Sequence, residues 1–297
     1  MKLCTFDAGN GPRLGALARD GRLLDAAAAT NGVVPAGMLD YLRTGEPARR
    51  ALQEALAKPP PGGAAHDLAA VRLLAPLPRP NTMRDCLAFE EHLKNAAPDR
   101  EIPQTWYEIP CYYKGNPDTV QGTEADVEWP SYTNLLDYEL EFAAVIGKEG
   151  RDIPKAEAWS YIAGYTVFND VSARDIQMKE MGLQLGPAKG KDMDGGNILG
   201  PYLVTADEWD PRDSHTMLAR VNGEEWSRGT TSAMHHDFGA IVSYISMGET
   251  IHVGDVIGSG TVGTGCGLEL RRFPKPGDVI ELEIEGIGVL RNRFVEK

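Results

Sequence analysis

Apolar residues fill most of residues 135–147, LLDYELEFAAVIG, in a pattern that predicts a strand buried on both faces. Side chains alternate across a strand, so Glu139 and Glu141 point to the same face, where Ala143 and Val145 continue the row. Larger apolar side chains occupy the opposite face. The sequence therefore predicts that a core strand carries two carboxylates into an apolar environment, where unpaired charges lose hydration or take up protons.

The same analysis predicts further strands at residues 163–169, 200–204, 217–221, 255–258, 268–273 and 279–284. Pro154 suits the first position of a helix through Tyr161, and Ser172 with Asp175 resembles a capping box that opens a second helix. A third helix is expected at residues 237–247. Because strands and helices do not alternate as in a doubly wound sheet, we expect an α+β fold that is mostly β.

Proline and glycine divide the chain into two parts. Residues 1 to about 57 combine short strand-like runs with a helical pattern, and residues 58–67, KPPPGGAAHD, indicate a linker or an exposed loop. We therefore expect a small N-terminal α/β domain at residues 1–78. A larger, strand-rich domain is expected at residues 79–297.

The composition is that of an ordinary globular protein of 297 residues, with 42% hydrophobic and 25% charged residues. Its formal net charge of −13 argues against nucleic acid or a membrane as a partner, because both bind basic surfaces. No apolar run has the length of a signal sequence or of a transmembrane span. The four cysteines are scattered, which indicates reduced thiols and a cytoplasmic location.

A divalent cation would remove the cost of burying Glu139 and Glu141. A third carboxylate, Asp170, follows the strand-like run at residues 165–168 and precedes the expected helix. Three carboxylates would hold a hard cation such as Mg²⁺ and leave coordination positions open to a substrate that chelates. From spacing alone, the alternative stays open that the glutamates line a solvated edge and that Asp170 is a turn residue.

Histidines and lysines supply further candidates. His92 lies on an expected helix and could activate water near neutral pH, although a helical histidine is more often a surface residue. Lys189 and Lys191 lie in a glycine-rich loop, where a lysine could stabilise an oxyanion or simply be solvated. The adjacent His235 and His236 are expected to start a helix rather than to bind a metal.

A glycine-rich stretch near the C-terminus spells GxGxxG with Gly258, Gly260 and Gly263. A dinucleotide site needs a helix after this motif, whereas a strand is expected here, so we reject that interpretation. We expect these glycines to let the backbone approach a ligand closely, with Thr261 offering a hydroxyl group. Glu269 is another carboxylate in an apolar setting, and the alternation alone favours an exposed face for it.

Together these stretches resemble the fumarylacetoacetate hydrolase family over residues 79–294, in the order RDCLAFEEH, YYKGNPDTVQG, DYELEFAAVIG, FNDVSARDIQ, GPAKGK and GSGT…GLEL. The resemblance implies that the metal ligands are Glu139, Glu141, Asp170 and Asp85. It further implies that His92 activates water, that Glu269 orients His92 and that Lys191 stabilises an enolate. The substrate-binding residues that it implies are Gln177, Tyr113 and Thr261.

The resemblance also implies a fumarylacetoacetase-type mixed β-sandwich roll, a homodimer, and Mg²⁺, or Mn²⁺ or Ca²⁺, as the cation. The implied activity is hydrolysis of a C–C bond in a small anionic keto acid, such as a 1,3-diketo acid. Isomerases, hydratases and decarboxylases of 2-oxo or 2-hydroxymuconate-type acids use the same metal site, so these activities stay open. A non-catalytic module that uses the ion only to hold its fold is the third alternative.

Overall fold

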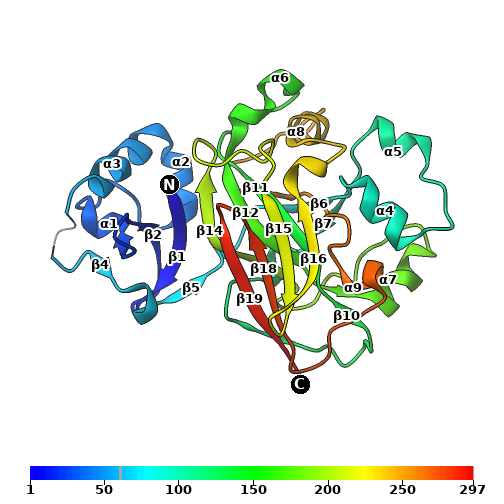
Figure 1. Cartoon of the computed structure of the whole chain (residues 1–297). Helices are drawn as coiled ribbons and strands as arrows, with labels where there is room; N and C mark the ends of the chain where they lie inside the picture. The colour runs from blue at the N-terminus through cyan, green and yellow to red at the C-terminus, as the bar shows by residue number, and fades with distance from the viewer. Residues whose placement is uncertain (60–61, 297) are drawn as a thin grey trace.

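The computed structural model describes residues 1–59 and 62–296 and consists of packed β-sheets with helices around them (Figure 1). In the described residues the largest sheet has twelve strands, in the order β4-β3-β2-β1-β14-β12-β11-β17-β6-β7, with β5 beside β1 and β8 beside β14. These strands are β1 (Lys2–Asp7), β2 (Pro12–Leu17), β3 (Leu23–Asp25), β4 (Ala65–His66), β5 (Arg72–Leu74), β6 (Met83–Cys86), β7 (Tyr112–Gly115), β8 (Val120–Gln121), β11 (Leu140–Ile146), β12 (Ile162–Asp170), β14 (Asn197–Thr205) and β17 (Val256–Gly258).

A smaller sheet of five strands packs on one face of the large sheet, where β12 and β14 contact β18 and β19. Its strands are β9 (Asp126–Glu128), β15 (Thr216–Val221), β16 (Glu224–Thr230), β18 (Val279–Ile284) and β19 (Gly288–Val295). A two-stranded sheet pairs β10 (Leu136–Asp137) with β13 (Ser172–Ala173). The expectation of an α+β fold that is mostly β is therefore confirmed.

The helices are short and lie around the sheets. The α-helices are α1 (Ala26–Ala29), α2 (Met38–Thr44), α3 (Glu46–Leu56), α4 (Glu90–Ala96), α5 (Gln104–Glu108), α6 (Lys155–Ala158), α7 (Arg174–Met181), α8 (Phe238–Ile245) and α9 (Gly267–Leu270). Single turns of 3₁₀-helix are η1 (Leu68–Ala70), η2 (Pro117–Thr119), η3 (Trp159–Tyr161) and η4 (Thr231–Ala233). In the described part of the chain, no helix is long and apolar enough to cross a lipid bilayer.

Strand β11 lies inside the large sheet, antiparallel to β12 on one side and to β17 on the other. All seven of its residues are buried. Phe142 and Ala144 enter the core between the two sheets, whereas Ala143 and Val145 enter the second core, which α2 and α3 cover. The prediction of a strand buried on both faces is therefore confirmed.

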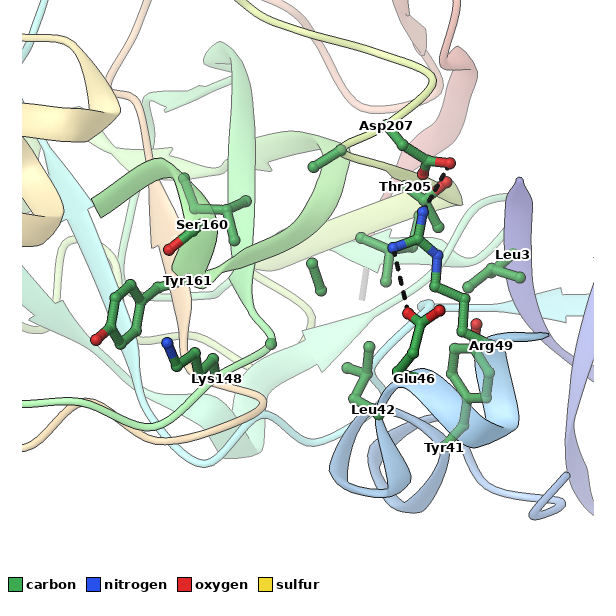
Figure 2. Close-up of a pocket in the computed structure, with 16 residues that line it drawn as sticks. Leu3, Tyr41, Leu42, Glu46, Arg49, Lys148, Ser160, Tyr161, Thr205 and Asp207 are labelled. Atoms are coloured by element: carbon green, nitrogen blue, oxygen red, sulfur yellow. Dashed lines mark ion pairs between the residues drawn. The ribbon is translucent and has the colours of Figure 1, made fainter. Parts of the chain in front are cut away.

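The strands of residues 1–78 continue the large sheet, because β1 pairs with β14 and places Leu3 opposite Leu203. A cavity of about 210 Å³ remains where α2 and α3 face the ends of β12 and β14 (Figure 2). Arg49 on α3 pairs there with Asp207, with 2.7 Å between nitrogen and oxygen. None of the residues predicted for the functional site lines this cavity. The domain boundary at residue 78 stays a prediction.

The expected linker at residues 58–67 is described only in part, since residues 60 and 61 lie outside the described residues. Ala65 and His66 within it form strand β4 and pair with β3. This end of the stretch therefore belongs to the sheet and is not a free connection.

The strand predicted at residues 268–273 is wrong. Asp137 accepts hydrogen bonds from the backbone N–H groups of Gly267 and Leu268, at 2.8 and 2.9 Å, and thereby caps the first turn of helix α9. The single strand predicted at residues 135–146 is divided into β10 and β11. Between them, Glu139 forms an isolated bridge with Cys266.

The predicted capping box of Ser172 and Asp175 is also wrong. Ser172 and Ala173 pair with β10, so helix α7 begins only at Arg174. Asp175 instead accepts a hydrogen bond from the backbone N–H of Asn134 at 3.1 Å. Long-range strand pairing therefore overrides the local signal at this position.

We predict that Gly164→Ala lowers the free energy of unfolding by about 1–3 kcal/mol, because the change overpacks the large sheet. A Cβ atom at Gly164 on β12 would lie 2.2 Å from the backbone oxygen of Val204 on β14. Urea unfolding followed by circular dichroism measures the effect. The control is Gly37→Ala, whose Cβ would meet only Asp40 Oδ2, at 3.6 Å. Equal unfolding midpoints for the two variants would contradict the prediction.

Candidate functional site

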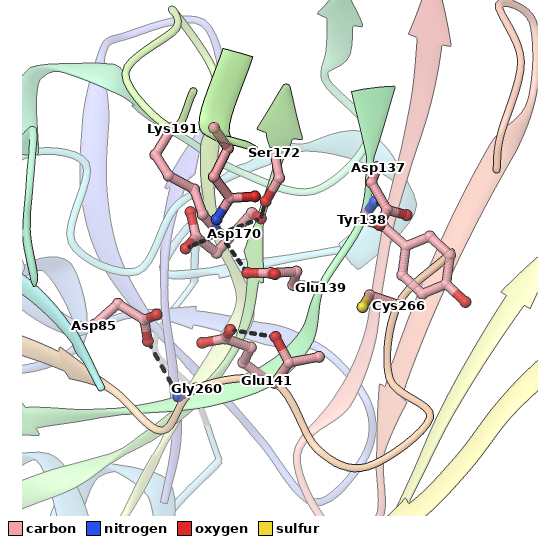
Figure 3. Close-up of polar contacts among 12 residues, drawn as sticks. Asp85, Asp137, Tyr138, Glu139, Glu141, Asp170, Ser172, Lys191, Gly260 and Cys266 are labelled. Atoms are coloured by element: carbon pink, nitrogen blue, oxygen red, sulfur yellow. Dashed lines mark hydrogen bonds and ion pairs between the residues drawn. The ribbon is translucent and has the colours of Figure 1, made fainter. Parts of the chain in front are cut away.

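Three buried carboxylates converge from three strands of the large sheet (Figure 3). Asp85 lies on β6, Glu141 on β11 and Asp170 at the end of β12. One oxygen of each lies within 4.8 Å of the others. The structure therefore brings together three of the four residues that the sequence predicts as metal ligands, from positions up to 85 residues apart in the chain.

Gly258 makes room for this convergence. It lies on β17 between β11 and β6, opposite both Ala143 and Asp85. A Cβ atom there would lie 2.2 Å from Asp85 Oδ1. The backbone N–H of Gly260, a residue with φ of +78°, donates to the same oxygen at 3.1 Å. These two glycines therefore accommodate a carboxylate of the protein, and the expectation that they also let the backbone approach a ligand stays a prediction.

The oxygens of the three carboxylates lack enough hydrogen-bond partners within the described residues. Glu141 Oε1 accepts from the hydroxyl of Thr261 at 3.2 Å, but Glu141 Oε2 and Asp170 Oδ1 are buried without any partner. An unsatisfied buried acceptor costs free energy, which a cation at this position would recover. The donor set consists of oxygen alone and therefore fits a hard divalent cation of the Mg²⁺ class.

The pKa values of these carboxylates likewise indicate that burying three negative charges together is unfavourable. Burial, together with the charge of Asp170, raises the pKa of Asp85 to about 8. Burial outweighs the charge of Lys191 and raises the pKa of Asp170 to about 6. Burial and the neighbouring carboxylates raise the pKa of Glu141 well above its usual range. Without a cation, part of the site is therefore kept protonated near neutral pH.

Glu139 differs from the other three carboxylates because the protein itself supplies its counterions. Its side chain pairs with Lys191 Nζ, and with Arg174 Nη1 at 2.8 Å. Burial would raise the pKa of Glu139, but these two charges outweigh it and lower the pKa to about 2. Glu139 is thus an ionised neighbour of the three-carboxylate group, and its role as a metal ligand stays a prediction.

Arg174 and Asp137 are part of this network, although the sequence analysis did not select them. Arg174 is 1% exposed, and its Nε donates to Asp137 Oδ2 at 2.8 Å. Its Nη1 also donates to Gln177 Oε1 at 2.9 Å. The spacing of Asp137, two residues before Glu139, could have extended the carboxylate pattern by one position. No local pattern indicates that an arginine at the start of a helix is buried.

Lys191 and Tyr113 connect the carboxylates to a cavity. Lys191 Nζ lies 2.6 Å from Asp170 Oδ2, and the Tyr113 hydroxyl donates to the same oxygen at 2.7 Å. Both residues line a cavity of about 180 Å³, together with Pro187 and Ala188. A small acid bound there would lie within reach of the lysine and of the tyrosine.

His92 and Glu269 form a hydrogen-bonded pair, with 2.8 Å between Nδ1 and Oε1. His92 lies on α4 as predicted, but it is 8% exposed rather than a surface residue. Asn95 Nδ2 donates to the other oxygen of Glu269 at 3.0 Å. In the described residues, the second ring nitrogen of His92, Nε2, has no hydrogen-bond partner, so it is free to exchange a proton with a bound molecule.

The other candidates do not join the site. Lys189 is exposed and donates to the backbone oxygen of Asp192. His235 and His236 precede helix α8 and contact the backbone oxygens of Tyr107 and Trp106. Neither histidine belongs to a group of metal-ligating side chains in the described part of the chain.

We predict that the metal-free protein loses stability as the pH rises from about 4 to about 8. The pKa values of Asp85, about 8, and Asp170, about 6, are raised in the folded state and return to about 4 on unfolding. The folded state therefore binds more protons than the unfolded state in this window, and its stability falls with rising pH. Glu139, with its lowered pKa, contributes stability that is lost only as the pH falls from about 4 towards about 2.

Urea unfolding of the chelator-treated protein between pH 5 and about 8 measures this dependence. Millimolar Mg²⁺ is expected to raise the unfolding midpoint, and the gain should be larger at the upper end of the range. A midpoint that is independent of pH and of Mg²⁺ would contradict a cation site at these carboxylates.

Both the sequence and the fold of this chain match those of known proteins. Residues 81–295 match the family model described as fumarylacetoacetate (FAA) hydrolase C-terminal. An oxaloacetate tautomerase of Bacillus subtilis is 30% identical over 99% of this chain and 100% of that protein. A mitochondrial oxaloacetate tautomerase of Homo sapiens is 33% identical over 99% and 92%. The structure of a fumarylacetoacetate hydrolase from Exiguobacterium antarcticum covers 100% of both chains with 30% identity and a TM-score of 0.81. The chain therefore belongs to the fumarylacetoacetate hydrolase family.

Proposed function

We propose that this protein is a Mg²⁺-dependent tautomerase that interconverts the enol and keto forms of a small 2-oxo dicarboxylic acid of the oxaloacetate class. The observation that carries the proposal is the His92–Glu269 pair beside the three buried carboxylates. It combines a proton-transferring group with a site for a chelating acid. The names of two relatives that match nearly the whole chain support the choice of substrate.

The contacts that connect the His92–Glu269 pair to the carboxylates support a shared substrate. Glu139 forms a backbone bridge with Cys266, and the Sγ atom of Cys266 lies 3.4 Å from Glu269 Oε1. The charge of a protonated His92 also lowers the pKa of Glu139. His92 is therefore close enough to the carboxylates to act on a molecule bound beside them.

Asp85, Glu141 and Asp170 would hold the cation, and Glu139 stands next to them. A hard divalent cation held there would bind a chelating 2-oxo acid and would polarise its carbonyl group. Lys191 places a positive charge beside the same carboxylates, where it would stabilise negative charge on the substrate oxygen.

His92 would move the proton. Its free Nε2 accepts the proton of the enol hydroxyl and returns a proton to the adjacent carbon, which yields the keto form without net gain or loss of protons. Glu269 accepts the hydrogen bond of Nδ1–H and stabilises the imidazolium that forms between the two steps. Asn95 and the backbone N–H of Thr264 hold Glu269 in place, at 3.0 and 2.7 Å.

Hydrolysis of a C–C bond in a 1,3-diketo acid is the second candidate. The whole-chain similarity to the Exiguobacterium hydrolase favours it, and His92 could take a proton from water in the same position. The names of the two tautomerase relatives support the first candidate over this one. The two reactions differ in their products, so one assay separates them.

We predict that His92→Ala lowers kcat for the enol–keto conversion by roughly 10²–10⁴-fold, the usual contribution of a general acid–base group. Decay of the enol absorbance of oxaloacetate with Mg²⁺ measures the rate. The matched control is His252→Ala, which removes a second histidine–glutamate pair of 2.8 Å, with Glu149, from the exposed surface. The control should keep the wild-type rate, and full turnover by His92→Ala would exclude a proton-transfer role.

We further predict loss of the enol band without new carbon fragments when oxaloacetate is incubated with the enzyme and Mg²⁺. Acylpyruvates, fumarylpyruvate and other 2-oxo acids complete the panel, with product analysis by mass spectrometry. Two fragments from any diketo acid would establish the hydrolase instead. No Mg²⁺-dependent change in any compound would contradict both candidates.

A further inference from the structure

A second group of metal-ligating atoms lies beside the three carboxylates and consists of His92, Cys266 and Glu269. The three side chains come from α4, from the residue before α9 and from α9 itself. One nitrogen, one sulfur and one oxygen lie within 4.8 Å of one another. Glu269 Oε1 is the shared neighbour, at 2.8 Å from His92 Nδ1 and 3.4 Å from Cys266 Sγ.

These separations are close to those that a tetrahedral zinc ion imposes on its ligands. Zn–N and Zn–O bonds of about 2.0 Å at tetrahedral angles place nitrogen and oxygen about 3.3 Å apart. A Zn–S bond of about 2.3 Å places sulfur and oxygen about 3.5 Å apart. His92 and Glu269 would need to separate by about half an ångström, whereas the separation of Cys266 from Glu269 already matches.

We propose that His92, Cys266 and Glu269 form an inhibitory site for a thiophilic divalent cation of the zinc class, distinct from the carboxylate site for Mg²⁺. Histidine nitrogen, thiolate and carboxylate are the ligands that zinc takes in proteins, with water in the fourth position. Mg²⁺ takes oxygen ligands and does not compete for the thiolate. The two groups share no residue.

Neighbouring residues fix the orientation of Glu269, the candidate ligand that contacts both His92 and Cys266. Glu269 Oε2 accepts hydrogen bonds from Asn95 Nδ2 at 3.0 Å and from the backbone N–H of Thr264 at 2.7 Å. Glu269 Oε1 is thereby directed at His92 and Cys266. Outer contacts of this kind hold metal ligands in place before the ion arrives.

Entry of the ion releases the thiol proton of Cys266 to solvent and leaves the single proton of the neutral His92 ring on Nε2. His92 then binds the ion through Nδ1 and can no longer accept a proton at Nε2. Inhibition by zinc therefore rests on the function proposed above for His92, whereas binding at the three ligands does not.

Cobalt(II) tests the site independently of activity. Titration of the full-length, chelator-treated protein with Co²⁺, in the presence of saturating Mg²⁺, is expected to give a thiolate-to-cobalt charge-transfer band that saturates at one equivalent. Zn²⁺ should abolish the band, and added Mg²⁺ should not. Absence of a saturable band would overturn the proposal.

Cysteine variants test whether Cys266 supplies the thiolate that binds cobalt. Cys266→Ser is expected to lose the band, whereas the matched control Cys111→Ser, which changes an exposed thiol, should keep it. A band that survives in a folded Cys266→Ser protein would overturn the proposal. Should that variant fail to fold, His92→Gln retains all four thiols and is expected to weaken cobalt binding at least ~10-fold. Unchanged affinity in His92→Gln would equally overturn the site.

The inhibitory effect is measured separately, as the Zn²⁺ concentration that halves the Mg²⁺-dependent rate of each protein relative to its own uninhibited rate. Cys266→Ser should need at least ~10-fold more Zn²⁺ than the wild type. Equal sensitivity of the two proteins would contradict inhibition through this site. If no tautomerase activity is found, the cobalt titration still decides whether the site exists, so the two proposals fail separately.

Discussion

The excess of negative charge at the centre of the large sheet is the constraint on which the rest of the site depends. Five buried carboxylates there, including Asp137, face two buried cations, Lys191 and Arg174, and water is largely excluded from all of them. A divalent cation would balance most of the remaining charge. Asp85, Glu141 and Asp170 lie on strands whose residues are almost all buried, so these three cannot relax by turning their charges towards solvent.

The two protein cations are not spread evenly over these carboxylates. Glu139 receives both of them and is ionised without further help, whereas Glu141 Oε2 and Asp170 Oδ1 have no partner among the described residues. Asp137 holds Arg174 beside Glu139, whereas Lys191 contacts both Glu139 and Asp170. Within one network, Glu139 is therefore paired by the protein itself, whereas Glu141 Oε2 and Asp170 Oδ1 could accept an added cation.

Part of this site could be predicted from the sequence because Glu141 and Asp170 lie on buried strands whose pattern is visible locally, and Glu139 precedes the first of these strands. The sequence did not indicate that Arg174 is buried, because the two carboxylates that compensate its charge, Asp137 and Glu139, lie far away in the chain. Asp137 also caps the helix around Glu269 through two backbone N–H groups, although the local pattern of that stretch is that of a strand. Local patterns thus predicted the buried strands correctly. They failed where contacts with distant side chains determine the local structure or the burial of a residue.

The pairing of β1 with β14 affects how the chain can be made and shortened. Leu3 lies opposite Leu203, so β1 pairs with a strand that is synthesised 200 residues later. Such non-local contacts slow folding and lengthen the time for which strand edges are open. A fragment that began at residue 79 would expose one edge of β14 permanently, and an exposed strand edge invites pairing with other chains. The N-terminal strands therefore cover an edge of the sheet that carries the three buried carboxylates.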